Sequence, residues 1–180
     1  MPEPVASLDF QIELASWRRI PKLRARLLEA ARVTAAHLPK KFAFPFTATL
    51  LLTGNARVRR LNHDFRGMDK PTNVLSFPHY PPQLLPKAGK HKGVVELGDI
   101  ALAYQYVVSE SKKEHKMLIN HVTHLVIHGL LHLFGYNHEL DHEAESMERL
   151  EIRIMKALGH SDPYAALADG ISAGGIKRPQ

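Results

Sequence analysis

The chain has 180 residues and no cysteine, and its 24 lysines and arginines against 18 aspartates and glutamates give a formal net charge of +6 at pH 7. This length can bury the core of one domain, and the lack of cysteine excludes disulfide bonds, disulfide-linked partners and thiolate metal ligands. No apolar run is long enough to cross a membrane, and the N-terminal residues lack the pattern of a signal peptide, so we expect a cytoplasmic protein with no membrane partner.

The first third of the chain predicts two strands and two helices. Residues 8–14 alternate apolar and polar side chains, which is typical of a half-buried strand. Apolar residues between 21 and 38 recur at helical spacing and predict an amphipathic helix. Residues 46–53 have strand composition, and Asn55 is a suitable N-cap for a short helix over residues 56–65.

The rest of the chain predicts two more strands and three helices. Residues 72–77 and 94–103 have strand composition, and the loop between them, over residues 78–93, is rich in proline, lysine and glycine and is expected to be mobile. Helical spacing then covers residues 105–115, 117–134 and 141–157. The last of these helices should turn apolar residues inward: Ala144, Met147, Leu150, Ile154 and Ala157.

These elements predict the α+β class, with a small mixed sheet of about four strands packed against about five helices. Residues 1–164 are expected to form a single domain. Residues 165–180, which are small and rich in glycine and alanine at first, are expected to form a disordered tail.

Three histidines stand close together in the run His128-Gly-Leu-Leu-His132-Leu-Phe-Gly135-Tyr-Asn-His138. On a helix His128 and His132 lie one turn apart, about 40° from each other around the axis, so both rings can bind one ion. Gly135 can adopt the left-handed conformation that ends a helix, which can bring His138 round as a third ligand. Three protein ligands leave the fourth position of Zn²⁺ for water, as in catalytic zinc sites. The run therefore predicts one Zn²⁺, or another divalent transition metal, on a zincin-like helix late in the chain.

The residue after the first histidine departs from the zincin peptidase pattern. Metzincin proteases carry a general-base glutamate there, whereas this chain has Gly129. A peptidase of that type needs the carboxylate to take a proton from water and pass it to the leaving amine. A peptidase is therefore the weaker hypothesis, although the metal site itself does not depend on residue 129.

The positive charge is concentrated in the first half of the chain. Basic residues gather in three groups: Arg18, Arg19, Lys22, Arg24, Arg26 and Arg32; Arg57, Arg59, Arg60, Arg66 and Lys70; and Lys87, Lys90 and Lys92. A basic surface near a metal site suits a polyanion such as nucleic acid, while ordinary solvated helix faces would give the same pattern.

Four segments, in the same order, resemble the YbeY family of bacterial metal-dependent endoribonucleases. They are the histidine run 128–138, the block Leu61-Asn-His-Asp-Phe-Arg66-Gly-Met-Asp-Lys-Pro-Thr-Asn-Val-Leu-Ser-Phe-Pro78, the segment Glu96-Leu-Gly-Asp-Ile100, and residues 141–151. The resemblance runs from about Leu50 to Tyr164. It implies an α+β domain, a zinc-type metal on His128, His132 and His138, and cleavage of single-stranded RNA. It also implies a role in 16S rRNA 3′-end maturation and ribosome quality control, with ribosomal RNA, the small ribosomal subunit and assembly proteins as partners.

Within this resemblance Arg66 falls on the functionally important arginine of the family. We expect the metal to activate a water that attacks a phosphodiester while the Arg66 guanidinium holds two phosphate oxygens. The alternative for Arg66 is an ion pair with Asp69 or Asp99. Thr72 and Ser76 are candidate substrate-binding residues in the same block.

The general base is not identified by the sequence. The candidates are Glu96, Asp99, His142 and Glu143. The chain departs from the family at Asn137, where an aspartate is frequent, and at His142, where an acidic residue is common. Phe77 is expected in the core, with base stacking as its alternative, and His121 and His124 are expected to be surface residues or to support the ligands without binding metal.

Two other functions are kept as alternatives. One is a zincin-like metallopeptidase or another metal hydrolase, which the histidine spacing favours and Gly129 disfavours. The other is a non-catalytic ribosome-assembly factor in which the metal mainly stabilises the fold.

Overall fold

The computed structural model describes residues 5–138 and 140–165. Within these ranges the strands are β1 (Ala6–Ile12), β2 (Phe46–Thr53), β3 (Val74–Pro78) and β4 (Val95–Ala103). The α-helices are α1 (Leu23–His37), α2 (Asn55–Arg66), α3 (Tyr104–Lys113), α4 (Leu118–Leu133) and α5 (Asp141–Ala157). Short 3-10 turns lie at Ala15–Arg19, Lys40–Phe42 and Pro82–Leu84.

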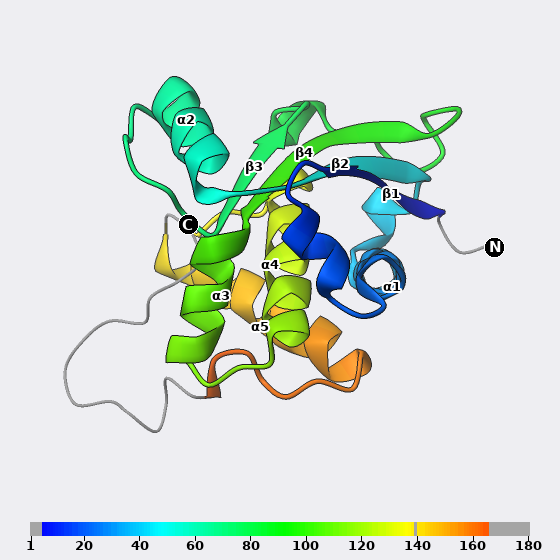
Figure 1. Cartoon of the computed structure of the whole chain (residues 1–180). Helices are drawn as coiled ribbons and strands as arrows, with labels where there is room; N and C mark the ends of the chain where they lie inside the picture. The colour runs from blue at the N-terminus through cyan, green and yellow to red at the C-terminus, as the bar shows by residue number, and fades with distance from the viewer. Residues whose placement is uncertain (1–4, 139, 166–180) are drawn as a thin grey trace.

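The four strands form one mixed sheet in the order β1-β2-β4-β3. The first three strands in this order are parallel, and β3 pairs antiparallel with β4 at one edge. Helices α1, α3, α4 and α5 lie on one side of the sheet, and α2 lies on the other side near β3 (Figure 1). The prediction of a small mixed sheet of about four strands with about five helices is confirmed.

The sheet and α4 together define the main core. On β2, Phe46, Ala48, Leu50 and Leu52 are buried against the helices, because alternate side chains of a strand share one face. Helix α4 lies between the sheet and the other helices (Figure 1), and every residue from 121 to 131 is buried. A helix that is apolar on all sides needs such a central position. The fold therefore buries His128 and leaves His132, one turn later, half-buried.

Most predicted boundaries agree with the structure, and a few assignments were wrong. Strand β1 starts and ends two residues earlier than predicted, and Thr72 precedes β3 instead of starting it. Asn55 is the first residue of α2 and Gly54 is its N-cap, because the Asn55 side chain turns to accept the Tyr106 N–H of α3. Ala157 is exposed at the end of α5 instead of facing inward.

The sequence predicted a mobile loop over residues 78–93 and a disordered tail over residues 165–180. The loop 78–93 contains a 3-10 turn and buries Leu85, so part of it packs on the core, and its mobility stays a prediction. The expected tail falls almost entirely outside the described residues. No helix among those described combines the length and the apolar character that crossing a bilayer would need.

Candidate metal centre

The C-terminal end of α4 places the histidines through a backbone turn that favours glycine. The N–H of Gly135 donates to the His132 carbonyl at 2.9 Å, and the N–H of Tyr136 donates to the Leu131 carbonyl at 3.0 Å. Gly135 has a φ of +83°, in the left-handed region. These paired hydrogen bonds are the Schellman ending of a helix. The turn brings His138 back beside the last turn of α4, as the sequence predicted.

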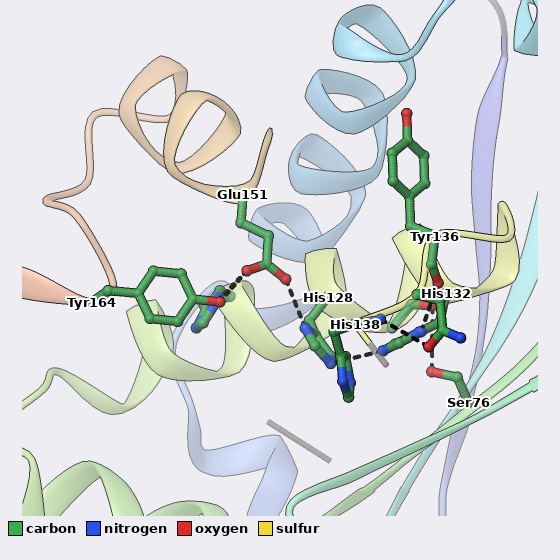
Figure 2. A network of polar contacts seen from close by, with 10 residues as sticks. Ser76, His128, His132, Tyr136, His138, Glu151 and Tyr164 are labelled. Carbon is green, nitrogen blue, oxygen red and sulfur yellow. Dashed lines mark hydrogen bonds and ion pairs between the residues drawn. The ribbon is translucent and has the colours of Figure 1, made fainter. Parts of the chain in front are cut away.

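The three histidine rings converge on one point (Figure 2). The Nε2 atoms of His128 and His132 are 3.0 Å apart. One ring nitrogen from each of His128, His132 and His138 lies within 4.8 Å of the other two. Among the described histidine, aspartate and glutamate side chains, these three histidines form the cluster whose geometry could hold a metal ion.

The second ring nitrogens of two of these histidines are held by oxygen atoms. The Nδ1 of His128 is 2.7 Å from the Glu151 carboxylate, and the Nδ1 of His132 is 2.9 Å from the Tyr136 carbonyl. These oxygens only accept hydrogen bonds, so each Nδ1 carries the proton and each neutral ring presents a lone pair at Nε2.

Two such lone pairs facing each other at 3.0 Å repel unless a cation lies between them. Two nitrogens bound to one tetrahedral zinc lie roughly 3.3 Å apart, given bond lengths of about 2.0–2.1 Å. The donor set of His128, His132 and His138 therefore fits a divalent metal.

Burial favours the neutral form of the histidines, which is the form that binds metal. Burial is the main cause that lowers the pKa of His132 to about 3, and the neighbouring His128 and His138 add to it. Burial also lowers the pKa of His128, although the hydrogen bond to Glu151 acts in the opposite direction. At neutral pH these rings need not release a proton before they bind a metal.

Glu151 of α5 is the residue of this centre that the sequence analysis missed. It is 0% exposed, and its Oε1 accepts the hydrogen bond from His128. Its Oε2 lies 3.3 Å from His124 Nε2 and also accepts a hydrogen bond from the Tyr164 hydroxyl (Figure 2). Burial raises the pKa of Glu151, but its interactions with His124 and His128 lower it by more, to below its usual range.

The other two histidines of α4 are both buried, so the expectation of surface residues was wrong. His124 contacts Glu151 and so supports the centre without being one of the three ligands, which was the alternative expectation. His121 instead pairs with Glu110 of α3, at 2.8 Å. Helical spacing carried a signal for Glu151, which follows the buried Met147 by one turn on the inward face of α5.

Gly129 lies where α4 touches the sheet. A Cβ at this position would lie 2.9 Å from Ile100 Cγ2 and 3.1 Å from Ser76 Oγ. The Ser76 hydroxyl donates to the Gly129 carbonyl at 3.3 Å. The small residue therefore permits close packing of the metal helix against the sheet. The same contacts leave no room for a glutamate side chain.

Arg66 ends α2, and its side chain is exposed. Neither alternative ion pair forms, because Asp69 is bound by Arg59 at 2.7 Å and Asp99 pairs with His79 at 3.5 Å. Nearby protein removes enough water to lower the pKa of the Arg66 guanidinium. Among the described residues no ion pair or hydrogen bond of Arg66 is found, so its guanidinium is available to an anion.

The edge strand β3 separates Arg66 from the histidines. Phe65, next to Arg66, packs against the half-buried Phe77 with ring centroids 5.1 Å apart. The preceding residue of the strand, Ser76, faces the opposite side and touches Gly129. Arg66 and the metal centre thus lie on opposite sides of β3, and the structure gives no direct contact between them.

The remaining predicted residues are spread around the centre. Thr72 is buried and its hydroxyl donates to the Asn73 side chain at 3.4 Å. The Asn137 side chain accepts the His138 N–H at 2.8 Å, so it holds the loop that carries the third histidine. A small cavity beside His128 and His138 is lined by Glu148 and Glu151. Its described lining does not include the four candidates for the general base: Glu96, Asp99, His142 and Glu143.

The sequence matches the family model described as "Endoribonuclease YbeY" over residues 11–159. A relative named endoribonuclease YbeY from Allorhizobium ampelinum is 44% identical over 164 residues, which cover 88% of this chain and 95% of the relative. Another of the same name, from Chelativorans sp. strain BNC1, is 43% identical over 162 residues, which cover 90% and 95% of the two chains.

The fold is also similar to the solution structure of TM1509 from Thermotoga maritima. The TM-score is 0.51 at 21% sequence identity, and the match covers 87% of this chain and 97% of the other. This likeness concerns the fold alone. From the family model and the identity over most of its length, the chain belongs to the YbeY family of endoribonucleases.

Proposed function

We propose that this protein is a single-strand-specific, metal-dependent endoribonuclease that acts in 16S rRNA 3′-end maturation and ribosome quality control. The observation that carries the proposal is the convergence of His128, His132 and His138 in a member of an endoribonuclease family, with the Nε2 lone pairs of His128 and His132 facing each other. The proposed partners are single-stranded or ribosomal RNA, the small ribosomal subunit and assembly proteins, in the cytoplasm.

The proposed cofactor is one Zn²⁺ per chain. A bound divalent metal supplies Lewis-acid chemistry, since it lowers the pKa of water toward about 7 and polarises phosphoryl oxygens. Three neutral imidazoles would hold such an ion, and Glu151 and the Tyr136 carbonyl fix the rings of His128 and His132.

Arg66 is proposed to hold the phosphate of the substrate. Its guanidinium has no acidic partner among the described residues, and it can donate to two phosphate oxygens at once. Since Arg66 lies across β3 from the histidines, the RNA strand would pass over the edge of the sheet to reach both. Ser76 and Thr72 lie in or next to this strand, and we propose them as further substrate-binding residues.

The peptidase alternative has no support from this geometry. A metzincin base would occupy position 129, where a Cβ alone already meets Ile100 and Ser76. The assembly-factor alternative is left to the experiment.

The proposal is tested by cleavage of a single-stranded rRNA fragment by highly purified protein. The wild type is compared with His132→Ala and Arg66→Ala, and bound metal is measured in each. We expect the wild type to cut, His132→Ala to lose both metal and cleavage, and Arg66→Ala to keep its metal without cutting. Equal cleavage by all three proteins would identify a contaminant and favour an assembly factor with a stabilising metal.

A second variant separates charge from geometry at position 66. Arg66→Lys keeps the positive charge but loses the paired donors of the guanidinium. We expect it to lose most of the cleavage activity while RNA binding at low salt falls far less. Cleavage near the wild-type rate would rule out the proposed contact.

A further inference from the structure

Glu151 is a buried carboxylate whose contacts fix its orientation. Both oxygens are used, with Oε1 toward His128 and Oε2 toward His124 and the Tyr164 hydroxyl. The groups come from three parts of the chain: the histidines from α4, Glu151 from α5, and Tyr164 from the segment that follows α5 (Figure 2).

The two oxygens have different tasks. Since His124 and Tyr164 both bind Oε2, the carboxylate cannot rotate about its last bond without breaking two contacts. Oε1 is thereby held 2.7 Å from the Nδ1 of His128. A proton fixed on that Nδ1 leaves Nε2 as the only free lone pair of the ring, and this lone pair faces His132.

The negative charge of Glu151 is a second way in which this residue can support a bound metal. A divalent ion on three neutral imidazoles would bring two positive charges into a site where His128 is buried. Glu151 is a buried carboxylate in direct contact with one of the three histidines, His128. Its negative charge, passed through the hydrogen bond, makes the His128 ring a stronger donor to a metal.

We propose that Glu151, locked by His124 and Tyr164, is the positioning residue that fixes the tautomer and orientation of His128 and so sets the metal affinity of the centre. This inference rests on the proposed metal site and goes beyond it, since it makes the segment after α5 part of the centre.

The pair of Glu110 and His121 is a matched control, because His121 lies on the same helix as His128. Glu110 pairs with His121 at 2.8 Å, much as Glu151 pairs with His128, but His121 lies two helical turns before the metal centre. Loss of either carboxylate removes a buried contact between a glutamate and a histidine of α4. Loss of Glu151 alone should affect the metal.

The experiment measures the dissociation constants of Zn²⁺ and Co²⁺ for the full chain by competition with a chromophoric chelator. The proteins are the wild type, Glu151→Gln, Tyr164→Phe and Glu110→Gln, with thermal unfolding of each metal-free protein as the measure of fold. We expect Glu151→Gln to bind Zn²⁺ about tenfold more weakly or worse, as for other groups that orient metal ligands. Tyr164→Phe should weaken binding by several-fold, and Glu110→Gln should leave it within about twofold of the wild type.

The absorption spectrum of bound Co²⁺ adds a readout that general destabilisation does not change. We expect the visible bands to shift in Glu151→Gln and to stay as in the wild type in Glu110→Gln. If Glu151→Gln fails to fold, Tyr164→Phe decides, since it removes only a hydroxyl group.

Wild-type affinity and spectra in both Glu151→Gln and Tyr164→Phe would overturn the inference. Equal weakening in Glu110→Gln would also overturn it, because the effect would then be structural. A wild type that binds neither ion would instead overturn the metal centre, and with it the proposed function.

Discussion

At the scale of single residues, Gly129 joins the metal helix to the sheet. A methyl group there would meet Ile100, a β-branched residue that is itself fully buried, at 2.9 and 3.0 Å. Overpacking of this kind costs about 1–3 kcal/mol, while the better helix propensity of alanine returns about 1 kcal/mol. We expect Gly129→Ala to lower the free energy of unfolding by about 1 kcal/mol, measured by urea denaturation.

Adding Ile100→Val to Gly129→Ala should recover part of this lost stability. Valine lacks the Cδ1 atom that lies 3.0 Å from the added methyl, and it keeps Cγ2. If Gly129→Ala proved as stable as the wild type, the close packing of α4 against β4 would not explain the glycine.

The sequence predicted the residues of the centre that are close in the chain and missed those that are distant. His128, His132 and His138 fall within eleven positions, so the geometry of one helix and one glycine turn is enough to bring them together. Glu151 meets His128 only because α5 packs against α4, and no local pattern gives that packing. For Arg66 the alternative to a phosphate contact was an ion pair with Asp69 or Asp99, and both aspartates pair with other residues.

At the scale of elements, the starts of α2 and α3 cap each other. The Asn55 N–H in the first turn of α2 donates to Gln105 Oε1 at 3.0 Å, and the Tyr106 N–H in the first turn of α3 donates to Asn55 Oδ1 at 3.0 Å. Each helix thus satisfies a free N–H of the other with a side chain. We expect Asn55→Ala to lower the free energy of unfolding by about 1 kcal/mol, the usual cost of a lost cap, in urea denaturation.

Gln105→Ala should cost a similar amount, and the double variant should cost less than the sum, because residues in one hydrogen-bonded pair are coupled. Strict additivity would show that the two contacts act independently.

The elements themselves were predicted best where one local signal covers the whole element. Residues 46–53 and 141–157 agree with β2 and α5 at both ends, since strand composition covers the first range and helical spacing covers the second. The start of α2 was misread because Asn55 can cap a helix locally, and nothing local reveals that it caps α3 instead. The strand order β1-β2-β4-β3 depends on contacts between distant segments, so no local pattern indicates it.

At the scale of the whole molecule, Glu110 connects three elements and makes stability depend on pH. Its carboxylate lies 2.8 Å from His121 of α4 and accepts a hydrogen bond from Asn73, just before β3, at 2.9 Å. Burial raises the pKa of Glu110, but these hydrogen bonds outweigh it and the pKa is lower than the usual value of 4.5. The unfolded state therefore takes up the proton first, and the contribution present above about pH 4.5 is lost as the pH falls through the folded-state pKa.

We expect the difference in free energy of unfolding between the wild type and Glu110→Gln to shrink as the pH falls from about 7 to below 4.5. Urea denaturation of metal-free protein measures it, and the comparison removes the effect of the other carboxylates. A difference that stays constant over this range would assign the contribution of Glu110 to packing alone.

Removal of the metal should also lower the stability of the whole chain, because the three ligands come from the end of α4 and from the loop that follows it. An ion that binds only the folded state stabilises it by about 4 kcal/mol when its free concentration is a thousand times the dissociation constant. For a chain of this size that is a fall in Tm of roughly 10 °C on addition of a chelator. Differential scanning calorimetry of the wild type, with and without excess Zn²⁺, measures the fall. His132→Ala is the control, since a chain without one ligand should show a much smaller dependence on Zn²⁺. If the chelator leaves the Tm of the wild type unchanged, the three histidines do not hold an ion that matters for folding, and the facing Nε2 atoms of His128 and His132 would need another cation, the simplest being a shared proton.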